Sequence, residues 1–311
     1  NSSEIDEAYA NMTHVSPPSP AIAIVFGCFT IVGIIGNIAL LLYILIHKLY
    51  QNFISSHFIA HLCVTNLVAL LALLPVFLYT VWTGVNVFQN SNFMCRLQAS
   101  ALLTCTVWTV MALMALCIAG VHLLTFARIH YDQLFGLRPG ILCMLSWVIS
   151  LVLALPSATN GHIVIYDASL RHCVWGHSDS GLKFLTYLLI LGVFIPAAFS
   201  SYAYVRVLGI LYHSPIVFQS LGLYKSRFLV YAFLLSPMYQ VPFYAVTMMH
   251  AKHAWRIQID AFWPAICMFL AFTQCLVSPA LYGASLFMMK EEDMALTART
   301  HKSATGYQHV Q

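Results

Sequence analysis

Long, nearly unbroken runs of apolar residues recur along the chain. The hydrocarbon core of a bilayer is about 30 Å thick and needs roughly 20 apolar residues per helix. The runs are continuous, whereas a membrane β-barrel would show short segments of alternating polarity. The pattern therefore predicts seven transmembrane helices, over Ala21–Ile46, Phe58–Val81, Phe93–Phe126, Ile141–Ala158, Phe184–Leu211, Phe228–Met249 and Ala261–Met289.

The composition supports a membrane protein. Of 311 residues, 60% are hydrophobic and 8% are charged, and the mean hydropathy is +0.81. A water-soluble globular domain of this length would carry more charged residues. The net charge of +4 is scattered, which argues against nucleic acid as a partner. We predict an all-α integral membrane protein with one seven-transmembrane helix bundle over residues 21–289, between an N-terminal tail (1–20) and a C-terminal tail (290–311).

The charges that flank the apolar runs predict the orientation of the chain. The N-terminal tail contains acidic residues but no Lys or Arg, and it has two glycosylation sequons, at Asn1 and Asn11. Nine of the 14 Lys and Arg residues fall on the opposite side of the seven spans, as is typical of cytosolic segments. We therefore expect an extracellular N-terminus, a cytosolic C-terminus, and a location among the lipids of the plasma membrane.

The nine cysteines divide by their depth in the predicted membrane. Seven lie within spans, where we expect small, buried, apolar side chains. Cys95, at the outer start of the third span, and Cys173, in the loop before the fifth, face an oxidising compartment. We therefore predict a disulfide between them that holds this loop across the mouth of the bundle.

Residues suited to metal binding or catalysis are not grouped in the sequence. His250 and His253 are close together but have no further ligands near them, so a solvated loop is the better interpretation. No nucleophile, base and acid form a set, and the spans contain almost no ionisable residues, which transporters and channels normally require. We expect no metal, no cofactor and no enzymatic activity, and a transporter is the weaker alternative.

The order and spacing of several residues resemble the rhodopsin-like (class A) G-protein-coupled receptors over nearly the whole chain. The resemblance implies a seven-helix receptor whose partner is a heterotrimeric G protein. It also implies that the receptor can associate with itself or with another receptor, as a homo- or heteromer. The matching residues are Gly36-Asn37, Leu62, Asn66, Pro75, Cys95 with Cys173, Trp147, Pro196, Tyr204, Pro242 and Ser278-Pro279-Ala280-Leu281-Tyr282.

Several matching residues also have a local physical role. Proline removes a helical hydrogen bond, so prolines within spans should kink them. The prolines concerned are Pro196, Pro242 and Pro279. Asn37, Asn66 and Ser278 lie in three different spans, and a lone polar group in hydrocarbon is costly. We therefore expect these three side chains to face inward and share hydrogen bonds, through water.

The inner end of the third span departs from the resembling family. The family carries an acid, an arginine and an aromatic residue there; counted from Cys95 and Trp147, this place holds Ala119-Gly120-Val121. In the family the arginine holds the inactive state and later packs against the G protein. His122 is a candidate substitute, but we favour a histidine that binds a carbonyl or a lipid headgroup at the membrane interface.

Two further switches are altered. The aspartate that resembling receptors use with sodium is Asn66 here, which is neutral, so we expect no sodium site. Gln240, two residues before Pro242, takes the place of a tryptophan under the ligand and must find hydrogen-bond partners. Tyr204 and Tyr282 are retained, and we expect them to join through water in an open state.

By family position, the ligand cavity is apolar and aromatic. The third span has no acid to pair with a protonated amine, and the seventh has no lysine to bind retinal, so an apolar or lipid-like ligand fits best. The alternative, in which side chains fill the bundle and leave no pocket, stays open. The residues at these positions are Leu102, Leu103, Thr106, Leu188, Gln240, Phe243, Tyr244, Thr247, Met268 and Phe272.

Two functions follow from these patterns, and the sequence does not choose between them. The first is a receptor-like signalling protein with degenerate activation motifs, which couples to a G protein without a ligand or binds an apolar one. The second is a decoy, scaffold or heteromer partner that has lost coupling, for which the missing arginine is the supporting feature.

After the last span, residues 286–290 (LFMMK) predict a short amphipathic helix in the membrane interface.

Overall fold

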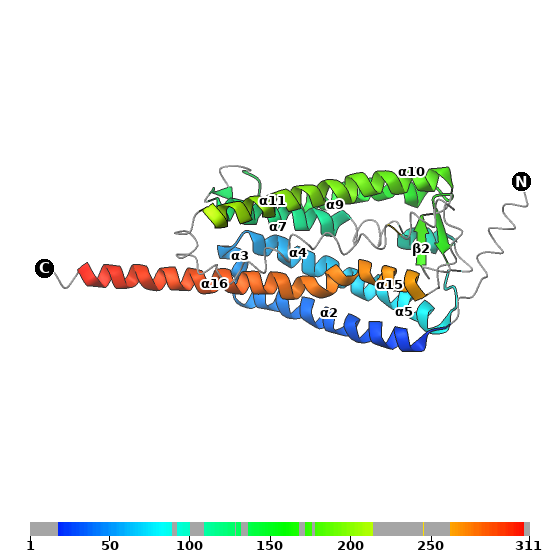
Figure 1. Cartoon of the computed structure of the whole chain (residues 1–311), viewed down its shortest axis with the longest axis horizontal. Coiled ribbons are helices and arrows are strands. Elements are labelled where there is room, and N and C mark those ends of the chain that lie inside the picture. The colour runs from blue at the N-terminus through cyan, green and yellow to red at the C-terminus, as the bar shows by residue number, and fades with distance from the viewer. Residues whose placement is uncertain are drawn as a thin grey trace, which may run out of the picture.

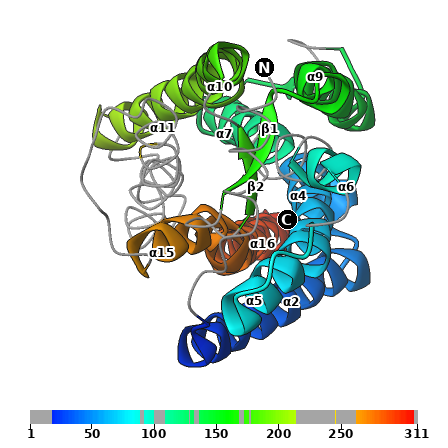
Figure 2. The same cartoon turned by 90° about the vertical axis from the view of Figure 1, so that its right-hand side faces the viewer.

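The computed structural model describes residues 18–88, 92–99, 109–127, 129–131, 136–167, 172–175, 178–213, 245 and 262–307. Long helices run along one common axis (Figure 1) and surround it when viewed from the end (Figure 2). The helices are α2 (Pro20–Ile46), α3 (Leu49–Asn52), α4 (Ser55–Val68), α5 (Leu74–Thr83), α6 (Asn92–Leu97), α7 (Met111–Phe126), α9 (Pro139–Thr159), α10 (Asp179–Leu188), α11 (Ile195–His213), α15 (Phe262–Ala271) and α16 (Thr273–Tyr307), with π-helical segments η1 (Ala69–Leu73) and η3 (Leu189–Phe194).

The predicted membrane-spanning helices are confirmed in the described part of the chain. Five helices among the described residues are long and apolar enough to cross a bilayer, and α7 is a shorter apolar helix that forms the C-terminal half of the predicted third span. The predicted sixth span, Phe228–Met249, lies outside the described residues. The five spans are Pro20–Ile46, Ser55–Thr83, Pro139–Thr159, Asp179–Ile210 and Phe269–Glu291.

The outer surface of the helices is apolar. Along α2, large hydrophobic side chains such as Ile31, Val32 and Ile35 are exposed, while Phe26, Leu40 and Ile44 face inward. An apolar surface of this extent would not be stable in water, and lipid tails are its natural environment. This chain is therefore a multi-pass membrane protein.

Two of the spans contain a π-helical segment that ends two residues before a proline. Segment η1 precedes Pro75, and η3 precedes Pro196. Proline has no N–H and its ring displaces the carbonyl one turn earlier, so the backbone widens locally to find other hydrogen bonds. Pro279 lies inside α16, which stays α-helical around it. Pro242 lies outside the described residues.

A β-hairpin lies at one end of the bundle, the end that faces the viewer in Figure 2 and at which α2 begins in Figure 1. Its strands, β1 (Val164–Asp167) and β2 (His172–Trp175), are antiparallel, and Tyr166 pairs with Cys173. A disulfide joins Cys173 to Cys95 in α6, with Cα atoms 5.5 Å apart. The predicted disulfide is confirmed, and it ties the hairpin to the start of the third span.

The C-terminal part of the chain differs from the sequence-based prediction. Residues 286–290 do not form a separate short helix in the described part; they continue α16, which runs without a break from Thr273 to Tyr307. Leu286 is fully buried, and Lys290 Nζ lies 5.6 Å from the centre of the Tyr43 ring in α2, so this stretch packs against the bundle. Figure 1 shows α16 extending past the other helices toward the C-terminus.

Candidate functional site

A polar cluster of Asn37, Asn66 and Ser278 joins three helices at the centre of the bundle. The Asn66 Nδ2 group donates hydrogen bonds to Asn37 Oδ1 (2.8 Å) and to Ser278 Oγ (2.7 Å). Asn37 Nδ2 donates to the carbonyl oxygens of Gly33 (2.8 Å) and Cys275 (2.9 Å). All three side chains are buried, as the sequence predicts, but they bond to one another directly rather than through water.

The orientation of the amides in the polar cluster follows from their partners. Two carbonyl oxygens require the Nδ2 end of Asn37, so its Oδ1 must accept a hydrogen bond. Asn66 therefore presents Nδ2 to Asn37 and uses both of its N–H groups as donors. Its Oδ1 atom is buried and has no hydrogen-bond partner among the residues that the structure describes. The polar cluster links α2, α4 and α16 without containing any charged group.

The C-terminal half of α7 lacks charged side chains. Ala119 and Val121 are buried. A Cβ atom placed on Gly120 would meet no atom of the described residues within 4 Å. This part of the third span therefore contributes neither an acid nor an arginine.

His122 is buried in the bundle and contacts Tyr204, whereas the sequence-based interpretation placed it against a carbonyl or a lipid headgroup. Its side chain is 6% exposed, and its Nδ1 atom lies 3.3 Å from the hydroxyl oxygen of Tyr204 in α11. The two rings meet edge to face, with centroids 6.2 Å apart. A helical periodicity places His122 on the same face of α7 as Ile118 and Ala119, which are buried in the bundle. The histidine thus joins α7 to α11.

Tyr282, the second retained tyrosine, is buried in α16. Tyr204 and Tyr282 come from helices that are far apart in the sequence, and each presents its phenol to the interior of the bundle rather than to lipid. Their burial agrees with an internal role.

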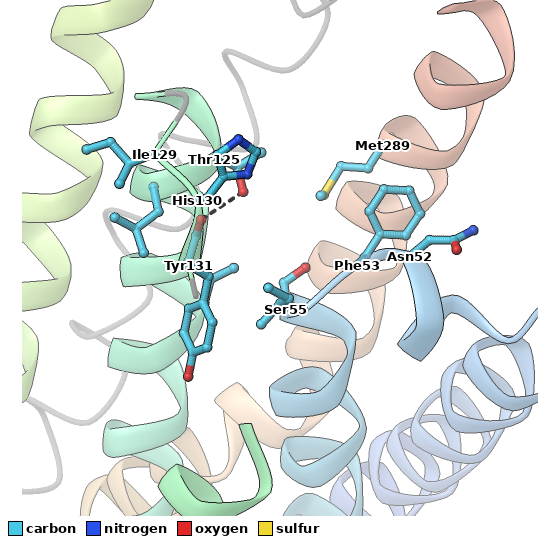
Figure 3. Close-up of a pocket in the computed structure, with 11 residues that line it drawn as sticks. Asn52, Phe53, Ser55, Thr125, Ile129, His130, Tyr131 and Met289 are labelled. Atoms are coloured by element: carbon cyan, nitrogen blue, oxygen red, sulfur yellow. Dashed lines mark hydrogen bonds between the residues drawn. The ribbon is translucent and has the colours of Figure 1, made fainter. Parts of the chain in front are cut away.

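A cavity of about 410 Å³ lies at the end of the bundle opposite the hairpin. We call it the end cavity. In Figure 3, Phe53 and Met289 lie on one side of it, Ile129 and His130 lie on the other, and Ser55 lies between them. It is lined by Asn52, Phe53, Ile54, Ser55, Val121, Leu124, Thr125, Ile129, His130, Tyr131 and Met289.

The structure describes only part of the predicted ligand pocket. Leu188 and Phe272 are buried inside the bundle. Met268 lies in α15. The remaining positions and both glycosylation sequons lie outside the described residues: Leu102, Leu103, Thr106, Gln240, Phe243, Tyr244, Thr247, Asn1 and Asn11.

Sequence reasoning missed two features that depend on tertiary structure. Trp147 Nε1 in α9 donates a hydrogen bond to His61 Nε2 in α4, so the tryptophan joins two spans. The end cavity combines a loop before α4, the end of α7 and part of α16, and no local signal in the sequence brings these three segments together. Its polar residues, such as Ser55 and Thr125, are unremarkable in the sequence alone.

The family comparison agrees with the fold and with the position of these residues. The chain matches the 7 transmembrane receptor (rhodopsin family) over residues 36–282. The match begins at Gly36, beside Asn37 of the polar cluster, and ends at Tyr282. It therefore includes the disulfide, the polar cluster and most of the end cavity, and the chain belongs to the rhodopsin family of seven-transmembrane receptors.

Proposed function

We propose that this protein is a receptor that couples to a heterotrimeric G protein and does so without a bound ligand. Rhodopsin-family receptors couple to heterotrimeric G proteins as a class. The observation that carries the proposal is the uncharged inner end of α7, where Ala119 and Gly120 stand in place of the family's acid and arginine. The end of the bundle opposite the hairpin is then the cytosolic end, and the N-terminus is extracellular at the plasma membrane.

An energetic argument connects this observation to ligand-independent coupling. A receptor's resting population depends on the free-energy difference between its closed and open bundles, and about 1.4 kcal/mol changes that ratio tenfold. A charged latch at the end of the third span would stabilise the closed bundle. With Ala119 and Gly120 this contribution is missing, so the open bundle is populated more often in the absence of ligand.

A second function has the same observation in its favour. The missing arginine also removes a contact to the G protein, so a receptor-like decoy, scaffold or heteromer partner without coupling is the alternative. Two features favour the signalling receptor: a Cβ atom at Gly120 would meet none of the described residues within 4 Å, and Tyr204 and Tyr282 remain buried in the bundle.

If a ligand binds from the extracellular side, we propose that it is apolar or lipid-like. The two described residues of the predicted pocket, Leu188 and Phe272, are apolar and buried. An apolar wall offers no counter-charge to an ionic ligand, which would have to give up its hydration without compensation.

A G-protein activation assay without added ligand tests the proposed function. Cells expressing the receptor with each G-protein class should show activation above an empty-vector control at matched surface expression. Gly120→Leu places a side chain into the open space and should lower this signal by about tenfold, because the transducer loses access to the α7 backbone. Gly140→Leu is the matched control, since Gly140 is also free of described neighbours within 4 Å but lies at the exposed start of α9.

Two results would contradict the proposal, the first by excluding coupling and the second by excluding α7 as the place where the transducer binds. A wild-type signal equal to that of the empty vector for every G-protein class would favour the decoy or scaffold. If neither Gly120→Leu nor Gly140→Leu lowers the activation signal, the transducer does not bind at the inner end of α7.

A further inference from the structure

Two lysines lie where helices α2 and α16 reach the same surface of the membrane. The span Pro20–Ile46 ends two residues before Lys48, and the span Phe269–Glu291 ends one residue after Lys290. The two helices lie side by side (Figure 1). A lysine at the end of a span places its ammonium group at the level of the lipid headgroups.

The ring of Tyr43 links Lys290 to the end of α2. Lys290 Nζ lies 5.6 Å from the centre of this ring, and the His47 ring meets it edge to face with centroids 4.7 Å apart. His47 is the C-cap residue of α2 and directly precedes Lys48. A cation over an aromatic ring is attracted to it and keeps its charge. We call these four side chains, Tyr43, His47, Lys48 and Lys290, the seam patch.

The positive charge of the seam patch is not neutralised by the protein. Within the part of the chain that the structure describes, neither Lys48 nor Lys290 forms an ion pair with a carboxylate. Lys48 is exposed and adopts the left-handed backbone conformation (φ 51°), which favours glycine. A lysine at this position costs free energy in folding, and its charge is the property that a glycine would not supply.

Apolar side chains flank the seam patch on the surface that faces lipid. Leu45 and Ile46 in α2 and Phe287 in α16 are each more than half exposed. Phe287 lies one turn before Lys290 on α16, and Ile46 lies one turn after Tyr43 on α2. A ligand at this place therefore meets two ammonium groups beside an apolar surface. A phospholipid, with its phosphate headgroup and acyl chains, matches this combination.

The carboxylates near the seam patch limit how negative the headgroup can be. Glu291, which is exposed, follows Lys290 directly, and Glu292 and Asp293 come next in the sequence. These carboxylates would repel a headgroup with several phosphates more strongly than a headgroup with a single phosphodiester. A phospholipid with one net negative charge therefore fits the two lysines better than a phosphoinositide does.

We propose that the seam patch binds an anionic phospholipid with a single net negative charge. Its phosphate lies between Lys48 and Lys290, and its acyl chains lie along the exposed apolar side chains of α2 and α16. Such a lipid would contact both helices near the place where α16 extends past the rest of the bundle. The proposal does not depend on coupling to a G protein.

Native mass spectrometry of the purified full-length receptor in detergent tests the proposal. We expect dioleoyl phosphatidylglycerol to bind about tenfold more tightly than dioleoyl phosphatidylcholine, which has the same acyl chains but no net charge. Lys290→Met keeps a long side chain and should reduce this preference about fivefold, as is typical of one basic residue at an anionic membrane surface. Lys183→Met is the matched control, because Lys183 is also exposed but lies in α10, which contacts the hairpin at the other end of the bundle.

A second variant separates lipid binding from folding. Lys48→Gly removes the charge and relieves the left-handed backbone conformation at this position. We expect it to raise the melting temperature in the absence of phosphatidylglycerol and to reduce the lipid preference about fivefold. A loss of lipid binding in this variant would then not result from a less stable fold.

Four outcomes would overturn the proposal. Equal affinities for phosphatidylglycerol and phosphatidylcholine would exclude a charge-selective site. If Lys183→Met lowers the preference as much as Lys290→Met does, the receptor attracts anionic lipid only in a general way. If the soluble headgroup glycerophosphoglycerol competes as well as the intact lipid, the seam patch binds phosphate without acyl chains. Tighter, Lys290-dependent binding of phosphatidylinositol bisphosphate would contradict the single charge. The G-protein assay measures coupling separately, so each of these outcomes leaves the proposed function standing.

Discussion

Asn66 donates hydrogen bonds from a single nitrogen atom to two other helices. This neutral amide therefore determines whether a cation can bind at the centre of the bundle. Its two N–H groups point at Asn37 and Ser278. A cation placed there would meet a neutral amide instead of a carboxylate, and it would have to lose its hydration without a compensating negative charge.

Sodium should therefore not stabilise the protein. We expect the same melting temperature in sodium, potassium and choline chloride at equal ionic strength. Asn66→Asp supplies a carboxylate and should make the melting temperature depend on sodium, although only partly, because Ser278 contributes no charge. A wild-type melting temperature that rises in sodium alone would contradict this prediction.

The contact between His122 and Tyr204 is a second residue-scale feature with a measurable energy. Hydrogen bonds between membrane helices contribute about 0.6 kcal/mol on average. We expect a double-mutant cycle with His122→Phe and Tyr204→Phe to give a coupling of about this size in the free energy of unfolding. Tyr202→Phe, on the exposed face of α11, should be additive with His122→Phe. Additivity in the His122–Tyr204 cycle would show that the two side chains do not interact.

At the scale of elements, the close approach of α2 and α16 depends on one glycine. A Cβ atom at Gly33 would overlap the Leu276 side chain and would lie 3.5 Å from the Leu276 Cα atom in α16. The absence of a side chain at Gly33 leaves room for the Leu276 side chain between the two helices, and Asn37, one turn further along α2, donates a hydrogen bond to the Cys275 carbonyl in α16. Side-chain packing and a hydrogen bond thus both join α2 to α16.

Gly33→Val should push α2 away from α16 and destabilise the protein by about 1–3 kcal/mol, as overpacking does elsewhere. Gly27→Val is the matched control, because Gly27 lies in the same helix and a Cβ there meets no described atom within 4 Å. Thermal unfolding in detergent would measure both variants. Equal melting temperatures for the two would mean that α2 and α16 are not packed as closely as described.

The hairpin depends on its disulfide in a similar way. Cys95 and Cys173 are 78 residues apart in the sequence, and closing a loop of this length removes up to about 4 kcal/mol of chain entropy from the unfolded state. Cys95→Ser or Cys173→Ser should lower surface expression, because the hairpin is no longer tied to the third span. Cys28→Ser, at an exposed free cysteine, should have no effect. Normal surface levels in both variants, with reactive thiols at Cys95 and Cys173 in the wild type, would contradict the prediction.

At the scale of the whole molecule, the sequence predicts those features that depend mainly on one free-energy contribution, such as the transfer of side chains into lipid. Hydropathy alone locates the five long spans that the structure describes, and the cost of a lone polar group in lipid brings Asn37 and Asn66 together. The sequence does not predict features that depend on how several helices pack against one another. The partner of His122 depends on the rotation of α7 against α11, and the end cavity depends on where a loop, α7 and α16 meet. The amphipathic pattern of residues 286–290 also did not predict that α16 continues as one helix beyond Lys290.

Helix α16 turns a small rearrangement at the centre of the molecule into a large displacement at its edge. It carries Ser278 of the polar cluster and continues as one helix to Tyr307, roughly 40 Å further on at about 1.5 Å per residue. A rigid arm of this length that tilts by about 5° at Ser278 moves its tip by roughly 3–4 Å. Any change at the Asn66–Ser278 hydrogen bond that tilted α16 would therefore be magnified by leverage at the C-terminal end of the helix.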